Sequence, residues 1–148
     1  MALDDLDQGR SGRKARAGFY DYDAEGKRLG LWPGLAAAFP PAPEQPDRTE
    51  VPQRLILVQA LEGVRALEQG VLEDIREGDV GAILGWGFAP WSGGPFGWLD
   101  IMGAARVLRL AEDFTARFGA RFAPPALLRD LADKGEGFYG RFATAKAA

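Results

Sequence analysis

The segment from Gly85 to Trp98 constrains this chain most, because its composition excludes both a regular helix and a regular strand. It holds five glycines and two prolines, which lower helix propensity and remove backbone donors. The same stretch carries large aromatic side chains, which favour burial, namely Trp86, Phe88, Trp91, Phe96 and Trp98. We therefore predict an ordered loop whose aromatic side chains pack against the flanking helices.

Apolar residues three and four positions apart predict helices on both sides of this loop. The longest runs from Glu50 to Glu68, with Pro52 in its first turn and Gly70 after its end. Its apolar surface is broad, which predicts a central helix that is buried on most sides. Further helices are predicted over about 78–84 with Asp79 as cap, over 95–103, from there to Phe118, and over 124–135.

The residues before Glu50 show weaker patterns. Residues 1–17 are polar and predict a loosely packed arm, and an aromatic stretch from Gly18 to Tyr22 follows. Asp23 to Gly26 predicts a turn, and residues 31–39 are consistent with a short helix. Prolines 40, 41, 43 and 46 then predict a stiff linker. We find no strand pattern, and the predicted fold is all-α with five or six helices.

Composition narrows the functional classes. The 148 residues include no cysteine and no histidine, so thiolate sites, Ser-His-Asp triads and histidine-based zinc sites are excluded. A net charge of −3 argues against nucleic-acid binding. No apolar run is long enough for a membrane span, and the acidic N-terminus is unlike a secretory signal, so we expect a cytoplasmic protein.

Several motifs together resemble one family. They are Gly85-x-Gly87-Phe88-x-Pro90-x-x-Gly93-Gly94-Pro95, then Trp98-Leu99-Asp100-x-x-Gly103, then Arg121-Phe122-x-Pro124-Pro125 and Gly135-x-Gly137-Phe138-Tyr139. This order resembles the C-terminal helical domain of 3-hydroxyacyl-CoA dehydrogenases, as in the second helical repeat of the multifunctional fatty-acid oxidation proteins. The Gly9 to Tyr22 stretch resembles the junction between the two repeats, and Gly18-Phe19-Tyr20 is echoed by Gly137-Phe138-Tyr139.

The resemblance implies a fold and a pathway. The fold is a helical bundle like the C-terminal domain of 6-phosphogluconate dehydrogenase. Residues 1–22 would be the tail of a preceding repeat, 23–49 a short helix and proline-rich linker, and 50–142 the helical domain. In the family a separate Rossmann domain binds NAD and supplies a catalytic histidine. This chain has no histidine, so the resemblance implies no catalytic residue and no cofactor bound here.

Three functional interpretations follow from the resemblance. The first is a non-catalytic domain of β-oxidation that packs against a Rossmann-containing dehydrogenase subunit or against its own copies. The second is a stand-alone acyl-CoA or small-ligand binding protein. The third is a degenerate remnant that only oligomerises. Gly93, Gly94, Pro95 and Phe96 are the candidate substrate-binding residues, although a tight connection between helices is the favoured explanation of these residue types.

The carboxylates have structural explanations too. Asp100 is consistent with a general acid, but a helix cap or buried acceptor is the better explanation. Glu73, Asp74, Glu77 and Asp79 form an acidic cluster without further ligand types, which favours a solvated helix entry over a metal site.

Overall fold

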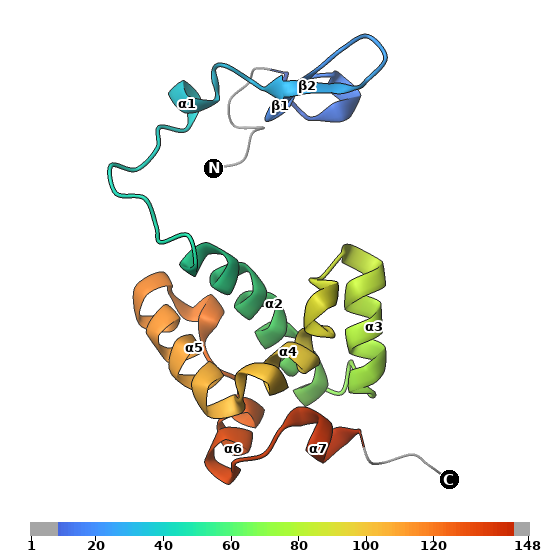
Figure 1. The fold of residues 1–148 in the computed structure, drawn as a ribbon, viewed down its shortest axis with the longest axis vertical. Helices are drawn as coiled ribbons and strands as arrows, with labels where there is room; N and C mark the ends of the chain where they lie inside the picture. The colour runs from blue at the N-terminus through green and yellow to red at the C-terminus, as the bar shows by residue number, and fades with distance from the viewer. Residues whose placement is uncertain (1–8, 144–148) are drawn as a thin grey trace. The chain divides into compact units, whose positions relative to one another are not determined.

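The computed structural model describes residues 9–143. Within that range it contains seven α-helices and one two-stranded sheet. The chain divides into two compact units, Met1–Gln45 and Pro46–Ala148, and each is described by itself (Figure 1). The mainly helical fold is confirmed. The helix number exceeds the predicted five or six because α1 (Leu35–Ala38) and α7 (Phe138–Phe142) are helices of four and five residues.

The first unit corrects the prediction of a chain without strands. β1 (Tyr20–Tyr22) and β2 (Arg28–Leu31) pair antiparallel, with Tyr20 opposite Leu31. The predicted turn at Asp23 connects them, and its side chain accepts hydrogen bonds from the backbone N–H groups of Glu25 and Lys27 at 3.1 and 2.8 Å. Strands of three and four residues are too short to show a clear alternation in sequence.

The first unit has almost no core. Gly18 is its single buried residue within residues 9–45. Its side chains instead form surface pairs: Phe19 and Phe39 have ring centroids 6.0 Å apart, and the Arg10 guanidinium lies 4.3 Å from the Trp32 ring centroid. A two-stranded hairpin is marginally stable on its own, so this unit gains little stability from burial within residues 9–45.

The second unit is a helical bundle. Its helices are α2 (Glu50–Glu68), α3 (Ile75–Trp86), α4 (Pro95–Met102), α5 (Ala104–Phe118), α6 (Ala126–Lys134) and α7. Helices α2, α4, α5 and α6 agree with the predicted ranges. The short helix α4 packs against α2, α3, α5 and α7, which places it at the centre of the unit (Figure 1).

The core of this unit is built from one face of each helix. On α5 the buried residues Val107, Ala111 and Phe114 follow the predicted spacing. Phe114 also makes an edge-to-face contact with Phe122, with ring centroids 5.5 Å apart. The prediction that α2 is buried on most sides is wrong at its N-terminal end, where the Leu55 side chain is 59% exposed.

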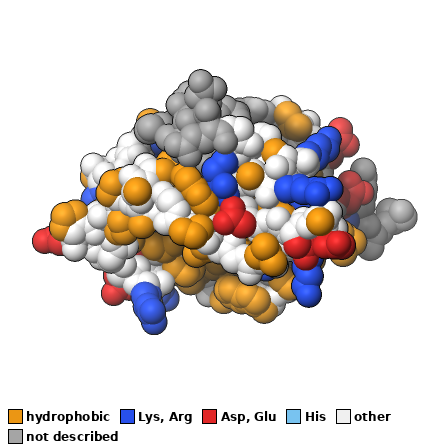
Figure 2. Space-filling model, turned by 90° about the horizontal axis from the view of Figure 1, so that it is seen from above, with side chains coloured by type: hydrophobic (Ala, Val, Ile, Leu, Met, Phe, Trp, Pro, Cys, Tyr) orange, Lys and Arg blue, Asp and Glu red, His pale blue; other side chains and the backbone are white. Residues whose placement is uncertain are grey.

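Apolar side chains also reach the surface of the molecule, as the orange areas in Figure 2 show. On the second unit, Leu84, Trp91 and Ile101 are among the large apolar residues that are mostly exposed. No helix within residues 9–143 combines the length and the hydropathy that a membrane crossing requires.

Candidate functional site

Asp79 is the only charged side chain among residues 9–143 that is almost fully buried, with 2% of its surface exposed. It lies on α3, and its carboxylate accepts hydrogen bonds from two backbone N–H groups at the start of α4. The Phe96 N–H donates to Oδ1 at 2.7 Å and the Gly97 N–H donates to Oδ2 at 3.0 Å. A carboxylate at this end of a helix satisfies unpaired donors and opposes the positive end of the helix dipole.

This geometry corrects the predicted role of Asp79. The sequence suggested that Asp79 caps its own helix, but α3 begins earlier and is capped by Asp74, whose side chain accepts from the Arg76 N–H. Asp79 instead caps a different helix, α4. One sequence signal pointed to its burial, since Asp79 lies four residues after Ile75 and three before Ala82, both buried.

Gly94 makes the approach of Asp79 possible. Its φ is +105° with an extended ψ of −179°, a combination that is essentially restricted to glycine. A Cβ atom there would lie 2.4 Å from Asp79 Cβ. Ser92, fully buried beside it, accepts a hydrogen bond from the Gly94 N–H at 3.3 Å and donates its hydroxyl to the Ala89 carbonyl at 2.6 Å. Gly94 therefore serves the close packing of this loop against α3.

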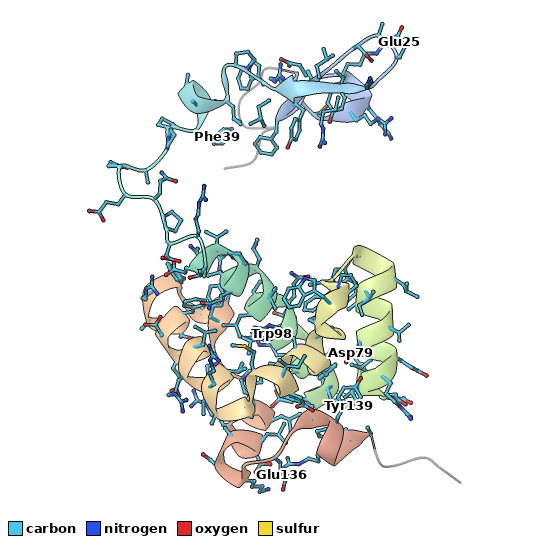
Figure 3. All side chains as sticks on the ribbon, viewed as in Figure 1. Glu25, Phe39, Asp79, Trp98, Glu136 and Tyr139 are labelled. Carbon is cyan, nitrogen blue, oxygen red and sulfur yellow. The ribbon has the colours of Figure 1, made fainter. Side chains whose placement is uncertain are left out.

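Asp100, near the end of α4, also caps a helix other than its own. Its carboxylate accepts from the backbone N–H groups of Phe138 and Tyr139 at 2.7 and 2.9 Å, which caps α7. This confirms the interpretation of Asp100 as a helix cap. The Tyr139 hydroxyl then donates to Asp79 Oδ2 at 2.8 Å. The labelled side chains of Asp79 and Tyr139 lie near each other in Figure 3.

These contacts form a closed ring of hydrogen bonds. Asp79 on α3 caps α4, Asp100 on α4 caps α7, and Tyr139 on α7 returns to Asp79. We call Asp79, Asp100 and Tyr139 the capping ring. It satisfies buried polar groups of three helices at once, and no buried side-chain N or O atom within residues 9–143 lacks a hydrogen-bond partner.

The electrostatics of the capping ring raise the pKa of two of its members. Burial raises the pKa of Asp79, and the nearby Asp100 charge adds to this, while the hydrogen bonds from Phe96, Tyr139 and Gly97 act in the opposite direction. Burial and the hydrogen bond to Asp79 raise the pKa of Tyr139 to about 12. The Tyr139 hydroxyl therefore stays protonated at neutral pH and acts as a hydrogen-bond donor.

The structure places the four predicted substrate-binding residues at the start of α4. Gly94, Pro95 and Phe96 are buried, whereas Gly93 is exposed. The first backbone donors of α4 are occupied by Asp79, so these amides are already paired. Pro95 and Phe96 also line a surface groove of about 790 Å³ between α2 and α3.

The aromatic side chains of the loop divide into two groups. Phe88, Phe96 and Trp98 are buried as predicted, but Trp86 and Trp91 are 65% and 75% exposed, so the prediction of general burial is wrong for these two. The Trp86 indole N–H donates to the Gln59 side-chain carbonyl on α2 at 3.1 Å. A tryptophan can remain at a surface when its N–H is paired and its ring is partly covered.

The predicted acidic cluster has separate environments in the structure. Asp79 is buried, and Asp74 pairs with Arg76 at 2.5 Å. Within residues 9–143 no group of acidic, histidine or cysteine side chains could hold a metal ion.

The two Gly-Phe-Tyr sequences noted above have different environments. Phe138 is fully buried against Phe96, whereas Phe19 is 47% exposed.

Comparison with known proteins supports the resemblance seen in the motifs. The fatty acid oxidation complex subunit alpha of Shewanella amazonensis is 40% identical across 88% of this chain. The proteins of the same name from Shewanella halifaxensis and Shewanella baltica are 38% and 35% identical across 88% and 90% of the chain. No family model matches the chain.

These relatives are much longer than this chain. The aligned region is 19% of the Shewanella amazonensis protein and 18% of the Shewanella halifaxensis protein. The chain therefore spans about a fifth of the length of the curated relatives it matches, and the similarity falls in their C-terminal region. The predicted relationship to the multifunctional fatty-acid oxidation proteins is confirmed at this level.

Proposed function

We propose that this chain forms a non-catalytic C-terminal helical domain of a fatty-acid β-oxidation protein related to 3-hydroxyacyl-CoA dehydrogenases. The observation that carries the proposal is the 40% identity to a fatty acid oxidation complex subunit alpha across 88% of the chain. The capping ring supports a structural role for these carboxylates, since Asp79 and Asp100 each accept hydrogen bonds from the start of another helix.

In this proposal the chain presents exposed apolar side chains to a companion domain or subunit. Leu84, Trp91 and Ile101 are each at least 73% exposed on the second unit, and the proposal requires that such residues form contiguous apolar surface, which marks contact sites. The companion is a Rossmann-containing dehydrogenase domain or a second copy of the chain. NAD binds to that companion in this proposal, and the protein works in the cytoplasm.

One observation favours a second candidate, a protein that binds acyl-CoA or another small ligand. Pro95 and Phe96, two of the predicted substrate-binding residues, line the α2–α3 groove. Ligand pockets are typically apolar clefts of this size. Saturable binding of a long-chain acyl-CoA to the isolated chain, weakened by a larger side chain at Gly81, would favour this candidate over the packing domain.

A chimera tests the packing proposal. The aligned segment of the Shewanella amazonensis subunit is replaced by this chain, and NADH formation from a 3-hydroxyacyl-CoA is measured. We expect activity within about tenfold of the parent subunit, no activity from the chain alone, and loss of activity when the segment is deleted. NADH formation by the chain alone, or full activity of the deleted subunit, would contradict the proposal.

A further inference from the structure

The α2–α3 groove has no part in the capping ring and stays open at the surface of the second unit. It has a volume of about 790 Å³, and Pro95 and Phe96 contribute to its lining from α4. α2 and α3 both pack on α4, so α4 holds the two walls. The hydrogen bond from Trp86 to Gln59 joins the two walls at one point.

Two glycines in the α3 wall are not explained by packing within the second unit. An added Cβ at Gly81 or Gly85 would meet no atom within 4 Å, although both residues lie inside a helix where glycine is unfavourable. Gly78 differs, because a Cβ there would lie 2.7 Å from the Leu72 side chain. The smooth wall at Gly81 and Gly85 allows another backbone to approach α3 closely.

The charged side chains that line the groove indicate which kind of molecule could bind there. Its lining residues include the carboxylates Glu62 and Glu77 and no lysine or arginine. Glu62 is exposed and pairs with Arg65 at 2.8 Å, whereas Glu77 has no ion-pair partner within 4 Å among residues 9–143. An anionic ligand such as a fatty-acid carboxylate or a phosphate is disfavoured here, and a cationic partner is favoured.

The apolar surface continues beyond the groove. Val80 and Leu84 lie one helical turn apart on α3 and are 57% and 80% exposed, and Trp86 is 65% exposed. A helix seated in the groove would cover Trp86, which lines it, whereas Val80 and Leu84 lie on α3 outside the groove lining. Two packed helices lie about 8–10 Å apart, and small residues at the contact give the shorter distance.

We propose that the α2–α3 groove binds an amphipathic helix of a companion domain, with alanine and leucine on its buried face and lysine or arginine beside Glu77. The inference rests on the packing role proposed above and names its surface and the chemistry of the partner. It is an instance of helix-in-groove recognition, in which apolar residues three and four positions apart anchor the helix.

The probes are three synthetic alanine–leucine helical peptides of equal length that differ only in their flanking residues, which are lysine, glutamine or glutamate. Binding to the full chain is measured by fluorescence anisotropy at low ionic strength. We expect the lysine peptide to bind at least about tenfold more tightly than the glutamate peptide, with the glutamine peptide between them. Glu77→Lys should remove or reverse this order.

Matched glycine variants locate the site. Gly81→Leu places an apolar side chain in the groove, where an added Cβ meets no atom within 4 Å, and should weaken the binding of the lysine peptide at least about tenfold. Gly140→Leu is the control, because Gly140 also lies exposed in a helix with no atom within 4 Å of an added Cβ, and it is outside the groove. The control should bind as the unchanged chain does, and circular dichroism should show that both variants fold.

Three results would overturn the inference. They are equal affinity for the lysine and glutamate peptides, undiminished binding by Gly81→Leu, and displacement of the lysine peptide by a fatty acid, which would make the groove a lipid site. Failure of the peptide binding with an active chimera would remove only the groove assignment. An inactive chimera with intact peptide binding would instead remove the dehydrogenase assignment.

Discussion

Replacing Gly94 by alanine tests whether Asp79 holds the start of α4. The added Cβ would lie 2.4 Å from Asp79 Cβ, so the carboxylate must move away from the Phe96 and Gly97 N–H groups. Backbone strain at φ +105° costs about 1–3 kcal/mol. Each buried donor left without its acceptor adds about 1–3 kcal/mol. We therefore expect Gly94→Ala to lower the free energy of unfolding by about 3–9 kcal/mol.

Gly93→Ala is the matched control for this prediction. Gly93 has a positive φ of +78°, but an added Cβ would meet only the Gly97 Cα at 3.9 Å. It keeps the strain without the collision, so its cost is about 1–2 kcal/mol. Urea unfolding followed by far-UV circular dichroism gives both values. The difference between the two variants measures the displacement of Asp79.

Hydrogen exchange gives an independent readout, since the Phe96 and Gly97 amides should exchange faster in Gly94→Ala and stay protected in Gly93→Ala. For a unit of this size, a loss of 3 kcal/mol corresponds to a fall in Tm of roughly 12 °C or more. Equal stability of the two variants, or an unchanged Tm in Gly94→Ala, would refute the contact between Gly94 and Asp79 on which the argument depends.

Three further predictions concern the capping ring and the groove. Tyr139→Phe should lower the free energy of unfolding, measured in urea, by about 1–2 kcal/mol. Because the pKa of Tyr139 is raised to about 12 in the folded state, the stabilisation by its hydroxyl is present below about pH 10 and is lost as the pH rises toward 12. Asp100→Ala should cost about 1–3 kcal/mol, with faster amide exchange in α7 and unchanged exchange in α5 as its signature. Gly81→Ala should raise the free energy of unfolding by about 0.5–1 kcal/mol, and a destabilised variant would show that the α3 wall is already covered.

Local periodicity explains which helices were predicted from sequence. α5 has a continuous apolar stripe through Val107, Ala111 and Phe114, and glycines stand at both of its ends, so its length and its buried face were both predictable. The strands β1 and β2 are too short for this kind of signal, and Gly30 interrupts the second one.

Long-range contacts explain the parts that were not predicted. The acceptor role of Asp79 depends on residues 17, 18 and 60 positions away, and no local pattern encodes such distances. The exposure of Trp86 and Trp91 was missed because aromatic residues are usually, but not always, covered by their own chain. The sequence predicted that Asp100 is a helix cap or a buried acceptor, but not that the helix it caps is α7.

The capping ring also sets the order in which the contacts of this domain can form during synthesis on the ribosome. A chain emerges from its N-terminal end, so Asp79 can meet the donors of α4 once residue 97 has left the ribosome. The third donor to Asp79 is Tyr139, which lies 60 residues further along the chain. Both donors to Asp100 come from the same late segment, at Phe138 and Tyr139. The bundle is therefore completed by its last described helix, and a nascent chain that stops before residue 138 leaves both carboxylates short of partners.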